Sequence, residues 1–526
     1  MYQASLSNPL FMKKFYITTA IDYANGKPHL GHAYEKVLAD VIARTHRLLG
    51  DDVHFLTGLD EHGQKVQQTA EKNGMTPQEL CDATAIDFRS MCRELSVLYN
   101  DYVRTTQPRH KVIVSEILQK LFDAGEIYKA EYNGYYSTVT EQFLHEKDKV
   151  DGVWPKDVFG DVIEMSESNY FFRLARHKKW LIGYINNHPD FIFPRFRAKQ
   201  VLEFLSDEVN DLCISRPKSR LSWGISLPFD DQYVTYVWFD ALINYISVVG
   251  YGTKDFERYW PVDYHIIGKD ILVPAHAVYW PIMLHALDIP MPKTLLAHGW
   301  WTCSGSKMSK SIGNVINPME YAKIYGPDPV RYFLIREMKV GQDSDFSHDL
   351  FISRYENDLG NDLGNLVSRI LNMVSRYCGG VCPEYDQAQG HDDGMALFWE
   401  ASRNKFIDQC RELQFHSAIE DVFEFIRATN RYIETRAPWK LAKSSADGDR
   451  VALLSTLAVA AECVRIAASA LYPIMPTLAD KIFHLFGLTQ EKFQWNSALL
   501  FGNSLAGNRF SESAILFPRI DLQEKA

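Results

Sequence analysis

The part of the chain that most constrains the fold lies between residues 14 and 57. Residues 14–19 are β-branched and aromatic, which predicts a short buried strand. After a loop of turn-forming residues and Pro28, apolar residues recur from Leu30 to Leu48 at the spacing of an amphipathic helix. Residues 53–57 predict a second strand. The order strand, helix, strand is typical of a parallel, doubly wound α/β sheet.

The length of the chain predicts several domains, because 526 residues exceed what one hydrophobic core usually holds. Residues 127–137 alternate around a glycine, which predicts an antiparallel hairpin, and strand-like residues 233–238 and 264–268 resume the α/β pattern. From residue 354 to about 485 the period is helical. We therefore expect an α/β protein with a doubly wound parallel (Rossmann-type) catalytic domain (1–116 and 229–299), an inserted α+β module (117–228), a contact region (300–353) and an all-α C-terminal domain (354–526).

Composition narrows the class of protein without identifying a partner. The net charge of −10 speaks only weakly against nucleic acid, since a large chain can carry a local basic face. The chain has no run of about 18 apolar residues and no secretory pattern at its start, so neither a membrane span nor secretion is expected. Among the scattered cysteines only Cys378 and Cys382 are close, which favours a reducing compartment over a zinc or disulfide framework. We expect a cytoplasmic protein, with an organellar matrix as the less favoured location.

A histidine motif, His29-Leu-Gly-His32, lies where the first strand gives way to the first helix. The N-terminus of a helix offers unpaired N–H groups and a positive dipole end, which suit a polyphosphate. Two imidazoles three residues apart lie on one helix face and can donate to phosphate oxygens, while Gly31 leaves room for a nucleotide. Four residues alone are a weak pattern, and two surface histidines are the alternative interpretation.

A second motif, Lys307-Met-Ser-Lys-Ser311, follows a loop rich in serine and glycine. Lys307 and Lys310 can form a cationic clamp for a leaving pyrophosphate, although a solvated basic turn has the same composition. The two motifs stand about 275 residues apart in an α/β chain. Together they resemble the signature of class I aminoacyl-tRNA synthetases.

Further segments resemble the methionyl-tRNA synthetase family within that class. They are residues 24–32, the Asp-Glu-His-Gly run at 60–63, and residues 236–241, 267–271, 341–347 and 517–521. The resemblance covers nearly the whole chain. It implies an enzyme that attaches methionine to its tRNA through a methionyl-adenylate intermediate, with ATP and Mg²⁺ and with the region 117–228 as its connective-peptide module.

Three alternatives stay open. A sibling class I synthetase for isoleucine, valine, leucine or cysteine shares both motifs, although the large aliphatic enzymes usually carry a bigger editing insertion than the about 110 residues here. A small nucleotidylyltransferase also uses an HxGH motif, but it needs no helical domain of this size. A non-catalytic RNA-binding relative would not need both motifs intact.

The resemblance implies which residues handle ATP. Catalytic roles fall on His29, His32, Lys307 and Lys310. The expected ATP contacts are these four side chains together with Gly31, Gly268, Asp270, Ser309 and Ser311.

A methionine pocket is expected from side-chain chemistry and from the resemblance together. A thioether is polarizable and makes almost no hydrogen bonds, so aromatic walls suit it. By resemblance, Asp60 binds the substrate ammonium, for which a carboxylate is needed. The other expected contacts are Ile21, Tyr23, Trp238, Leu242, Tyr245, Ile271, His276 and Trp280. Residues 271–276 look one residue longer than the family's usual spacing, and Leu242 replaces a frequent proline, which leaves the geometry of the pocket open.

The resemblance also implies where tRNA binds. The helical domain is the expected anticodon reader, with Trp495 stacking on a base and Asn430 contributing from a neighbouring helix. No cysteine lies between residues 93 and 212, where many family members carry zinc knuckles, so no zinc is expected. The chain stops without the β-barrel appendage that makes some relatives dimers, so a monomer is expected.

Overall fold

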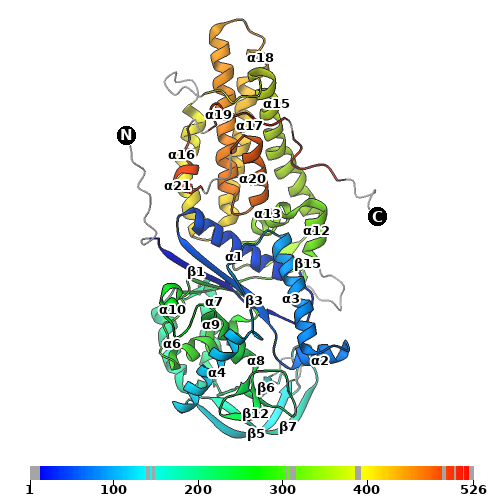
Figure 1. Cartoon of the computed structure of the whole chain (residues 1–526), viewed down its shortest axis with the longest axis vertical. Helices are drawn as coiled ribbons and strands as arrows, with labels where there is room; N and C mark the ends of the chain where they lie inside the picture. The colour runs from blue at the N-terminus through cyan, green and yellow to red at the C-terminus, as the bar shows by residue number, and fades with distance from the viewer. Residues whose placement is uncertain are drawn as a thin grey trace.

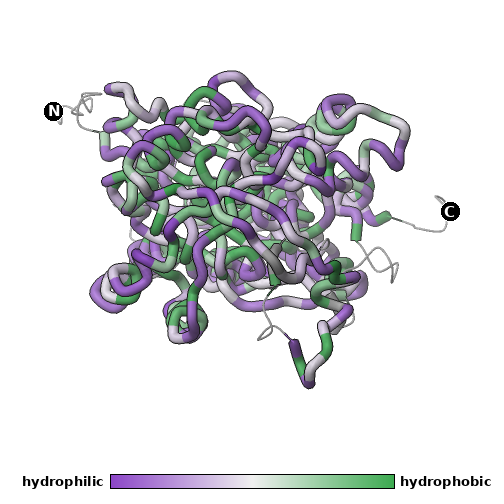
Figure 2. The backbone as a smooth tube through the Cα atoms, turned by 90° about the horizontal axis from the view of Figure 1, so that it is seen from below, coloured by the Kyte–Doolittle hydropathy of each residue, from purple (hydrophilic) through white to green (hydrophobic). Residues whose placement is uncertain are grey.

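The computed structural model describes residues 12–137, 142–144, 149–303, 305–307, 316–384, 393–488, 493–502, 505–512 and 514–520. A parallel sheet lies at the centre of the molecule, a helical domain stands above it, and further helices and antiparallel strands lie below it (Figure 1). Hydrophobic stretches of the chain run through the interior, and hydrophilic stretches are frequent on the outer loops (Figure 2).

The central sheet is parallel, and its strands follow the order β2–β3–β1–β13–β14–β8, with β4 also paired to β3. These strands are β1 (Lys14–Thr19), β2 (Asp22–Tyr23), β3 (Asp52–Asp60), β4 (Asp101–Arg104), β8 (Ile192–Phe193), β13 (Tyr264–Gly268) and β14 (Thr294–His298). From β1 the chain first crosses to β3 on one side and later returns to β13 on the other. In α/β sheets with such a reversal, ligands bind at the carboxyl ends of the strands beside the reversal, which here are the ends of β1 and β13. The predicted doubly wound sheet is confirmed.

Helix α1 (Leu30–Leu48) packs against β1, β3 and β13 and, on its other side, against α13 (Pro327–Glu337). All the apolar positions that define its predicted face are buried. Glu35, Lys36 and Asp40 are buried as well, so the helix is covered on more sides than an amphipathic surface helix would be. The helices that follow β3 and β4 are α2 (Gln64–Lys72), α3 (Pro77–Glu94) and α4 (Pro108–Asp123).

The predicted hairpin at residues 127–137 is wrong. β5 (Ile127–Ser137) is one continuous strand that pairs antiparallel with β6 (Gln142–Leu144) and β7 (Val162–Phe172). Gly134 lies opposite Met165 in the ladder, and a Cβ there would meet the hydroxyl of Tyr132 at 2.5 Å. The glycine therefore makes room for a tyrosine on its own strand and does not form a turn.

The rest of the predicted insertion contains β9 (Leu212–Cys213), α5 (Lys156–Phe159), the 3₁₀ helix η3 (Leu174–His177), α6 (Lys178–Asn187) and α7 (Phe196–Ser206). Strand β8 also falls within residues 117–228, yet it pairs with β14 at the edge of the parallel sheet. Helix α4 runs across the predicted limit at residue 117. The inserted segment thus shares elements with the catalytic domain, and the domain limits stay predictions.

The second half of the catalytic domain differs from the prediction at residues 233–238. β12 (Asp230–Thr235) is antiparallel to β10 (Ser215–Pro217) and β11 (Ser226–Leu227) in a separate small sheet. Helix α8 (Val237–Leu242) begins directly after it, so Trp238 lies on a helix. A short aromatic, β-branched run fits both elements, and only the flanking Asp240 in the first helical turn favours the helix. Next come α9 (Asn244–Ser247), α10 (Lys254–Tyr259), the π-helix η4 (Leu272–Tyr279) and α11 (Trp280–Ala286).

A small sheet of β15 (Trp301–Cys303), β16 (Ser306–Lys307) and β17 (Ser344–Phe346) leads to the helical domain. The helices from there to the C-terminus are α12 (Pro318–Tyr325), α13, α14 (His348–Ser353), the π-helix η5 (Arg354–Gly364), α15 (Asn365–Cys378), α16 (Asp393–Arg411), α17 (Phe415–Arg436), α18 (Pro438–Leu441), α19 (Asp447–Leu471), α20 (Pro476–Leu485) and α21 (Trp495–Ala498). Helix α19 is long and apolar enough to cross a membrane by length and composition, but 78% of its most apolar window is buried among the other helices, as in a core helix. The predicted all-α domain is confirmed.

Arg331 joins the sheet domain to the helical domain. This guanidinium on α13 is fully buried, and it donates to Asp40 of α1 at 2.7 Å and to the Leu95 carbonyl at 2.9 Å. It also donates to the carbonyls of Pro473 and Ile474, between α19 and α20, at 2.7 and 2.8 Å. A buried charge is tolerated when it is paired and hydrogen-bonded, and this guanidinium makes four hydrogen bonds, one of them to a carboxylate.

Replacing Arg331 with methionine should destabilise the protein strongly. The change leaves Asp40 buried beside only one remaining cationic partner, Arg44, and removes the donor from three buried carbonyls. We expect a loss of about 3–5 kcal/mol in the free energy of unfolding, measured by urea denaturation. The exposed pair Arg258–Asp52 provides the control, since Arg258→Met should cost under about 1 kcal/mol. Equal losses for the two variants would contradict this role of Arg331.

Candidate active site

The histidine motif forms the start of helix α1, at the carboxyl end of β1. His29 is the N-cap residue, and its Nδ1 accepts a hydrogen bond from the Gly31 N–H at 3.1 Å. The backbone N–H of His29 donates in turn to Nδ1 of His32 at 3.2 Å. In each neutral ring Nε2 therefore carries the proton and is a donor. The two rings lie 3.8 Å apart at the positive end of the helix, an arrangement suited to binding phosphate.

Gly31 serves this cap directly. A Cβ at position 31 would lie 3.0 Å from Cε1 and 3.2 Å from Nδ1 of the His29 ring. The missing side chain therefore lets the imidazole fold back onto the helix start, in addition to the predicted role of leaving room for a nucleotide.

A buried ionic network lies beside the motif. Lys36 donates to the Ala20 carbonyl, to Asp22 and to Glu35 at 2.9, 3.1 and 2.8 Å. Glu35 also contacts Nε2 of His298, at the end of β14, at 3.2 Å. Burial raises the pKa of Asp22 to about 7 even with the Lys36 ammonium beside it. The network ties the loop after β1 to α1 and β14, and thereby holds the segment that leads into the motif.

Gly268 and Asp270 follow β13, the strand next to β1. A Cβ at Gly268 would meet Oδ1 of Asp270 at 2.5 Å, so the glycine allows this carboxylate to lie against the strand end. Lys269 between them donates from its backbone to the His298 carbonyl and from its side chain to Asp343. The structure therefore brings two predicted ATP contacts, Gly268 and Asp270, to the same edge of the sheet as the histidine motif.

The lysine motif is described only at its start. Lys307 ends β16, which pairs with β15. Residues 308–315, including Ser309, Lys310 and Ser311, lie outside the described residues, so the predicted clamp stays a prediction.

The residues predicted to bind methionine gather near the carboxyl ends of the same strands. Leu242, Tyr245 and Trp280 belong to one buried hydrophobic cluster, and Ile21, Tyr23, Trp238 and Ile271 pack against it while partly exposed. The rings of Tyr245 and Trp280 lie 5.7 Å apart. Asp60 ends β3, pairs in register with Tyr23 and is 8% exposed. The structure thus places a buried carboxylate in register with Tyr23, which packs against an aromatic cluster whose inner members are buried.

His276 and Tyr245 satisfy one another's polar atoms. Nδ1 of His276 lies 2.9 Å from the Ile271 carbonyl, which only accepts, so this nitrogen carries the proton. Nε2 then accepts from the Tyr245 hydroxyl at 2.8 Å. Burial lowers the pKa of His276 to about 4, which keeps the ring neutral. The π-helix η4 carries this histidine, and its one residue outside helical geometry, Val273, lies in the segment that looks one residue longer than usual.

The two predicted anticodon residues have structural contacts. Trp495 is 1% exposed, its Nε1 donates to the Ser469 carbonyl at 2.9 Å, and its ring lies 5.1 Å from that of Phe406. The Asn430 amide donates to the carbonyl of Asp362 in η5 at 2.9 Å. In this conformation both side chains hold the helical domain together, and their contacts with tRNA stay predictions.

Within the described residues, no three or more histidine, cysteine or acidic side chains lie together in a group that could hold a metal ion. Cys378 and Cys382 are both free thiols.

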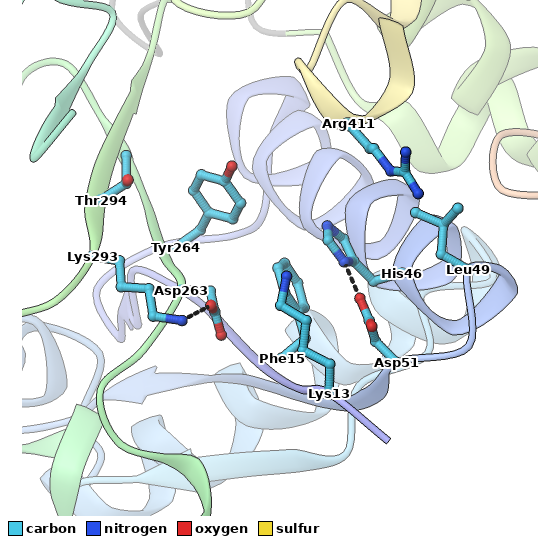
Figure 3. A pocket seen from close by; sticks show the side chains of 10 residues that line it. All are labelled: Lys13, Phe15, His46, Leu49, Asp51, Asp263, Tyr264, Lys293, Thr294 and Arg411. Carbon is cyan, nitrogen blue, oxygen red and sulfur yellow. Dashed lines mark hydrogen bonds and ion pairs between the residues drawn. The ribbon is translucent and has the colours of Figure 1, made fainter. Parts of the chain in front are cut away.

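The pocket in Figure 3 lies at the opposite edge of the sheet. It has a volume of about 420 Å³ and is bounded by the amino-terminal ends of β1, β13 and β14, the last turn of α1, and Arg411 at the end of α16. Its charged side chains are largely paired with one another, Lys293 with Asp263 at 2.5 Å and His46 with Asp51 at 2.7 Å. None of the predicted site residues lines it.

A histidine motif at the switch point of a parallel sheet, with a helical domain behind it, defines a class I aminoacyl-tRNA synthetase. The family model described as "tRNA synthetases class I (M)" matches residues 15–161 and 155–371, and that of the "Anticodon-binding domain of tRNA ligase" matches residues 401–512. The methionine–tRNA ligase of Caldanaerobacter subterraneus subsp. tengcongensis is 41% identical over 98% of this chain and 80% of its own length. The chain belongs to the methionyl-tRNA synthetase family and is a methionine–tRNA ligase.

Other relatives support the same family. The methionine–tRNA ligase of Bacillus subtilis is 39% identical over 97% of this chain and 79% of its own length. The structure of Mycobacterium tuberculosis methionyl-tRNA synthetase in complex with methionyl-adenylate matches with a TM-score of 0.90 at 37% identity, over 97% of this chain and 100% of that one. The sibling synthetases that the sequence left open are therefore not favoured.

Acid should weaken the fold through His276. Its pKa falls from an ordinary 6.5 to about 4 on folding, so between these values the unfolded chain binds a proton that the folded chain does not. Stability from this group is present above about pH 6.5 and is lost as the pH falls. Between about pH 7 and about pH 5, His276→Asn should lose about 2 kcal/mol less unfolding free energy than the unsubstituted chain. Urea titrations at the two pH values measure this. The exposed His188→Asn is the control and should lose as much unfolding free energy as the unsubstituted chain. If His276→Asn also loses as much as the unsubstituted chain, the low pKa of His276 is refuted.

Proposed function

We propose that this chain joins methionine to tRNA at the carboxyl edge of its parallel sheet, in two steps through methionyl-adenylate. The observation that carries this proposal is that the histidine motif on α1, the aromatic cluster and Asp60 lie near one edge of the parallel sheet. No side-chain nucleophile is needed, because positioning and electrostatic stabilisation suffice for both steps.

In the first step a methionine carboxylate oxygen attacks the α-phosphorus of ATP, and the bond to the β-phosphate bridging oxygen breaks. Pyrophosphate leaves with the electron pair. The Nε2–H groups of His29 and His32, with Lys307 and Lys310, stabilise the growing negative charge. Backbone at Gly31 and the hydroxyls of Ser309 and Ser311 add phosphate contacts, and Gly268 and Asp270 bind the ribose.

ATP enters as its Mg²⁺ complex. Mg²⁺ is typically held by substrate phosphates, waters and one or two carboxylates. The ion would neutralise part of the phosphate charge.

In the second step a hydroxyl of the tRNA terminal ribose attacks the carbonyl carbon of the adenylate, and AMP leaves. The methionine stays in its pocket during both steps, with Asp60 binding its ammonium group. The walls are Ile21, Tyr23, Trp238, Leu242, Tyr245, Ile271, His276 and Trp280.

The chemistry of the pocket lining fits a thioether. The Tyr245 hydroxyl and both ring nitrogens of His276 are engaged within the protein, and the Trp280 N–H donates to His265 at 3.2 Å. A side chain that needs hydrogen bonds would therefore lose those it makes with water, whereas methionine needs none.

The helical domain is the part of the chain that we propose reads the anticodon. Trp495 is packed in the core of this domain, so stacking on an anticodon base would require its side chain to leave the core. We propose a monomer that acts in the cytoplasm.

Substituting His32 should slow adenylate formation without weakening methionine binding. His32→Ala removes a donor to the departing pyrophosphate, so kcat for ATP–pyrophosphate exchange should fall about 100- to 1,000-fold. The KM for methionine should change less than about 2-fold. His46→Ala is the matched control, because it lies on the same helix at the opposite edge of the sheet. A loss confined to the KM for methionine would contradict the phosphate role.

Substituting Asp60 should weaken methionine binding and leave ATP binding nearly unchanged. Asp60→Asn keeps the size of the side chain and removes the charge that binds the ammonium, so the KM for methionine should rise about 30-fold or more. The KM for ATP should stay within about 2-fold. Asp328→Asn, at a buried carboxylate that accepts from the Leu478 N–H in the helical domain, controls for lost stability. Equal effects on methionine and ATP would overturn this assignment.

A further inference from the structure

Helix α8 carries a buried carboxylate that the proposed mechanism does not use. Asp240 lies two residues after Trp238 and is 0% exposed. Its Oδ2 is 2.6 Å from Nδ1 of His62, and its Oδ1 is 2.7 Å from Nε2 of His110. Both imidazoles are buried too. Because a carboxylate only accepts hydrogen bonds, each of these ring nitrogens carries a proton and donates it.

The two imidazoles keep this carboxylate charged. Burial alone would raise the pKa of Asp240, but His62 and His110 hold that pKa at about 2. Hydrogen bonds of this kind to an ionised acceptor are stronger than neutral ones. A buried carboxylate that loses one such donor is left with an uncompensated charge, so the three side chains depend on one another.

The members come from distant parts of the chain. His62 follows Asp60 by two residues, and His110 lies in the first turn of α4. They are 178 and 130 residues from Asp240. The remaining ring nitrogen of His110, Nδ1, lies 2.9 Å from Oγ of Ser247, at the end of α9, the helix that carries Tyr245. We name His62, His110, Asp240 and Ser247 the Asp240 cluster.

Backbone hydrogen bonds do not supply the connection that the Asp240 cluster makes. Within the described part of the chain, none joins residues 60–63 to residues 237–247. The backbone of residues 60–63 is bonded elsewhere: Ala24 donates to the Asp60 carbonyl, Glu61 donates to Thr105, and Gly63 donates to the Trp223 carbonyl. The hydrogen-bonded link between the Asp60 segment and α8 therefore runs through the side chains of His62 and Asp240.

We propose that the Asp240 cluster is a positioning device for the methionine pocket, which sets the separation between Asp60 on one side and Trp238 and Tyr245 on the other. This inference rests on the proposed roles of those three residues. No member of the Asp240 cluster is itself a proposed methionine contact. A ligand held at one end by a charge and at the other by aromatic rings is sensitive to that separation, since small misplacements weaken both contacts.

Asp240→Asn tests the proposal. The amide oxygen can accept from one imidazole, but the NH₂ group can bond to the other ring only if that ring changes its tautomer. In either case the charge of the acceptor is lost, and with it the stronger hydrogen bonds that a carboxylate accepts. In ATP–pyrophosphate exchange the KM for methionine should rise at least about 10-fold, while the KM for ATP stays within about 2-fold. Glu462→Gln is the matched control: this buried carboxylate pairs with Arg465 in α19, away from the proposed pocket. It should lower the melting temperature comparably and leave both KM values unchanged. Equal changes in both KM values for Asp240→Asn, or none in a folded protein, would overturn the proposal.

A second pair of variants decides the question if Asp240→Asn does not fold. His110→Gln keeps a donor for Asp240, whereas His110→Phe fills the same space without one. The glutamine variant should keep the KM for methionine within about 3-fold, and the phenylalanine variant should raise it at least about 10-fold. Equal values for the two would show that the hydrogen bond to Asp240 does not position the pocket.

Asp60→Asn, measured in parallel, separates this inference from the proposed function. If that variant leaves the KM for methionine unchanged, the proposed pocket itself fails. If Asp60→Asn raises the KM while Asp240→Asn behaves like Glu462→Gln, the pocket stands and only the positioning role fails.

Discussion

Helix α1 is covered on its sheet side by β1, β3 and β13 and on its other side by α13. Several of its charged side chains are therefore buried. A charged side chain without access to water must find its partners within the protein. Lys36 finds them in Asp22 and Glu35, and Asp40 finds Arg331. The first set holds the segment that leads into the histidine motif, and the second joins the helical domain to the sheet. The geometry of the phosphate site and the placement of the helical domain therefore depend on the same helix.

The elements predicted correctly are those whose signal is local. Residues 14–19 and 264–268 form strands, and residues 30–48 form a helix, because their hydrophobic period alone decides between the two states. The hairpin predicted at 127–137 was wrong, and of residues 233–238 only 233–235 form a strand, which lies in a separate antiparallel sheet. Six to eleven aromatic and β-branched residues fit a strand, a hairpin or the start of a helix, and only the packing of distant segments selects one of them.

The site was predictable in its composition and less so in its connections. The motifs and the aromatic set identify which residues gather near the carboxyl edge of the sheet, but the contacts that orient them span large separations, such as 263 residues between Glu35 and His298. The available signal was the presence of charged residues within an otherwise apolar helix and of His62 and Asp240 inside two recognised segments. For Trp495 the residue was identified but its role was not predictable. A tryptophan that packs in a core and one that stacks on a base look the same in the sequence.

The His29 ring has two functions. Its Nδ1 accepts from the Gly31 N–H and caps helix α1, and its Nε2–H is the proposed donor to phosphate. Selection for catalysis and selection for folding therefore act on the same imidazole and cannot be relaxed separately. Grafting the motif onto another scaffold would accordingly require the whole helix start, including the strand end from which it departs, because the four residues alone would bring neither the cap nor the ring orientation.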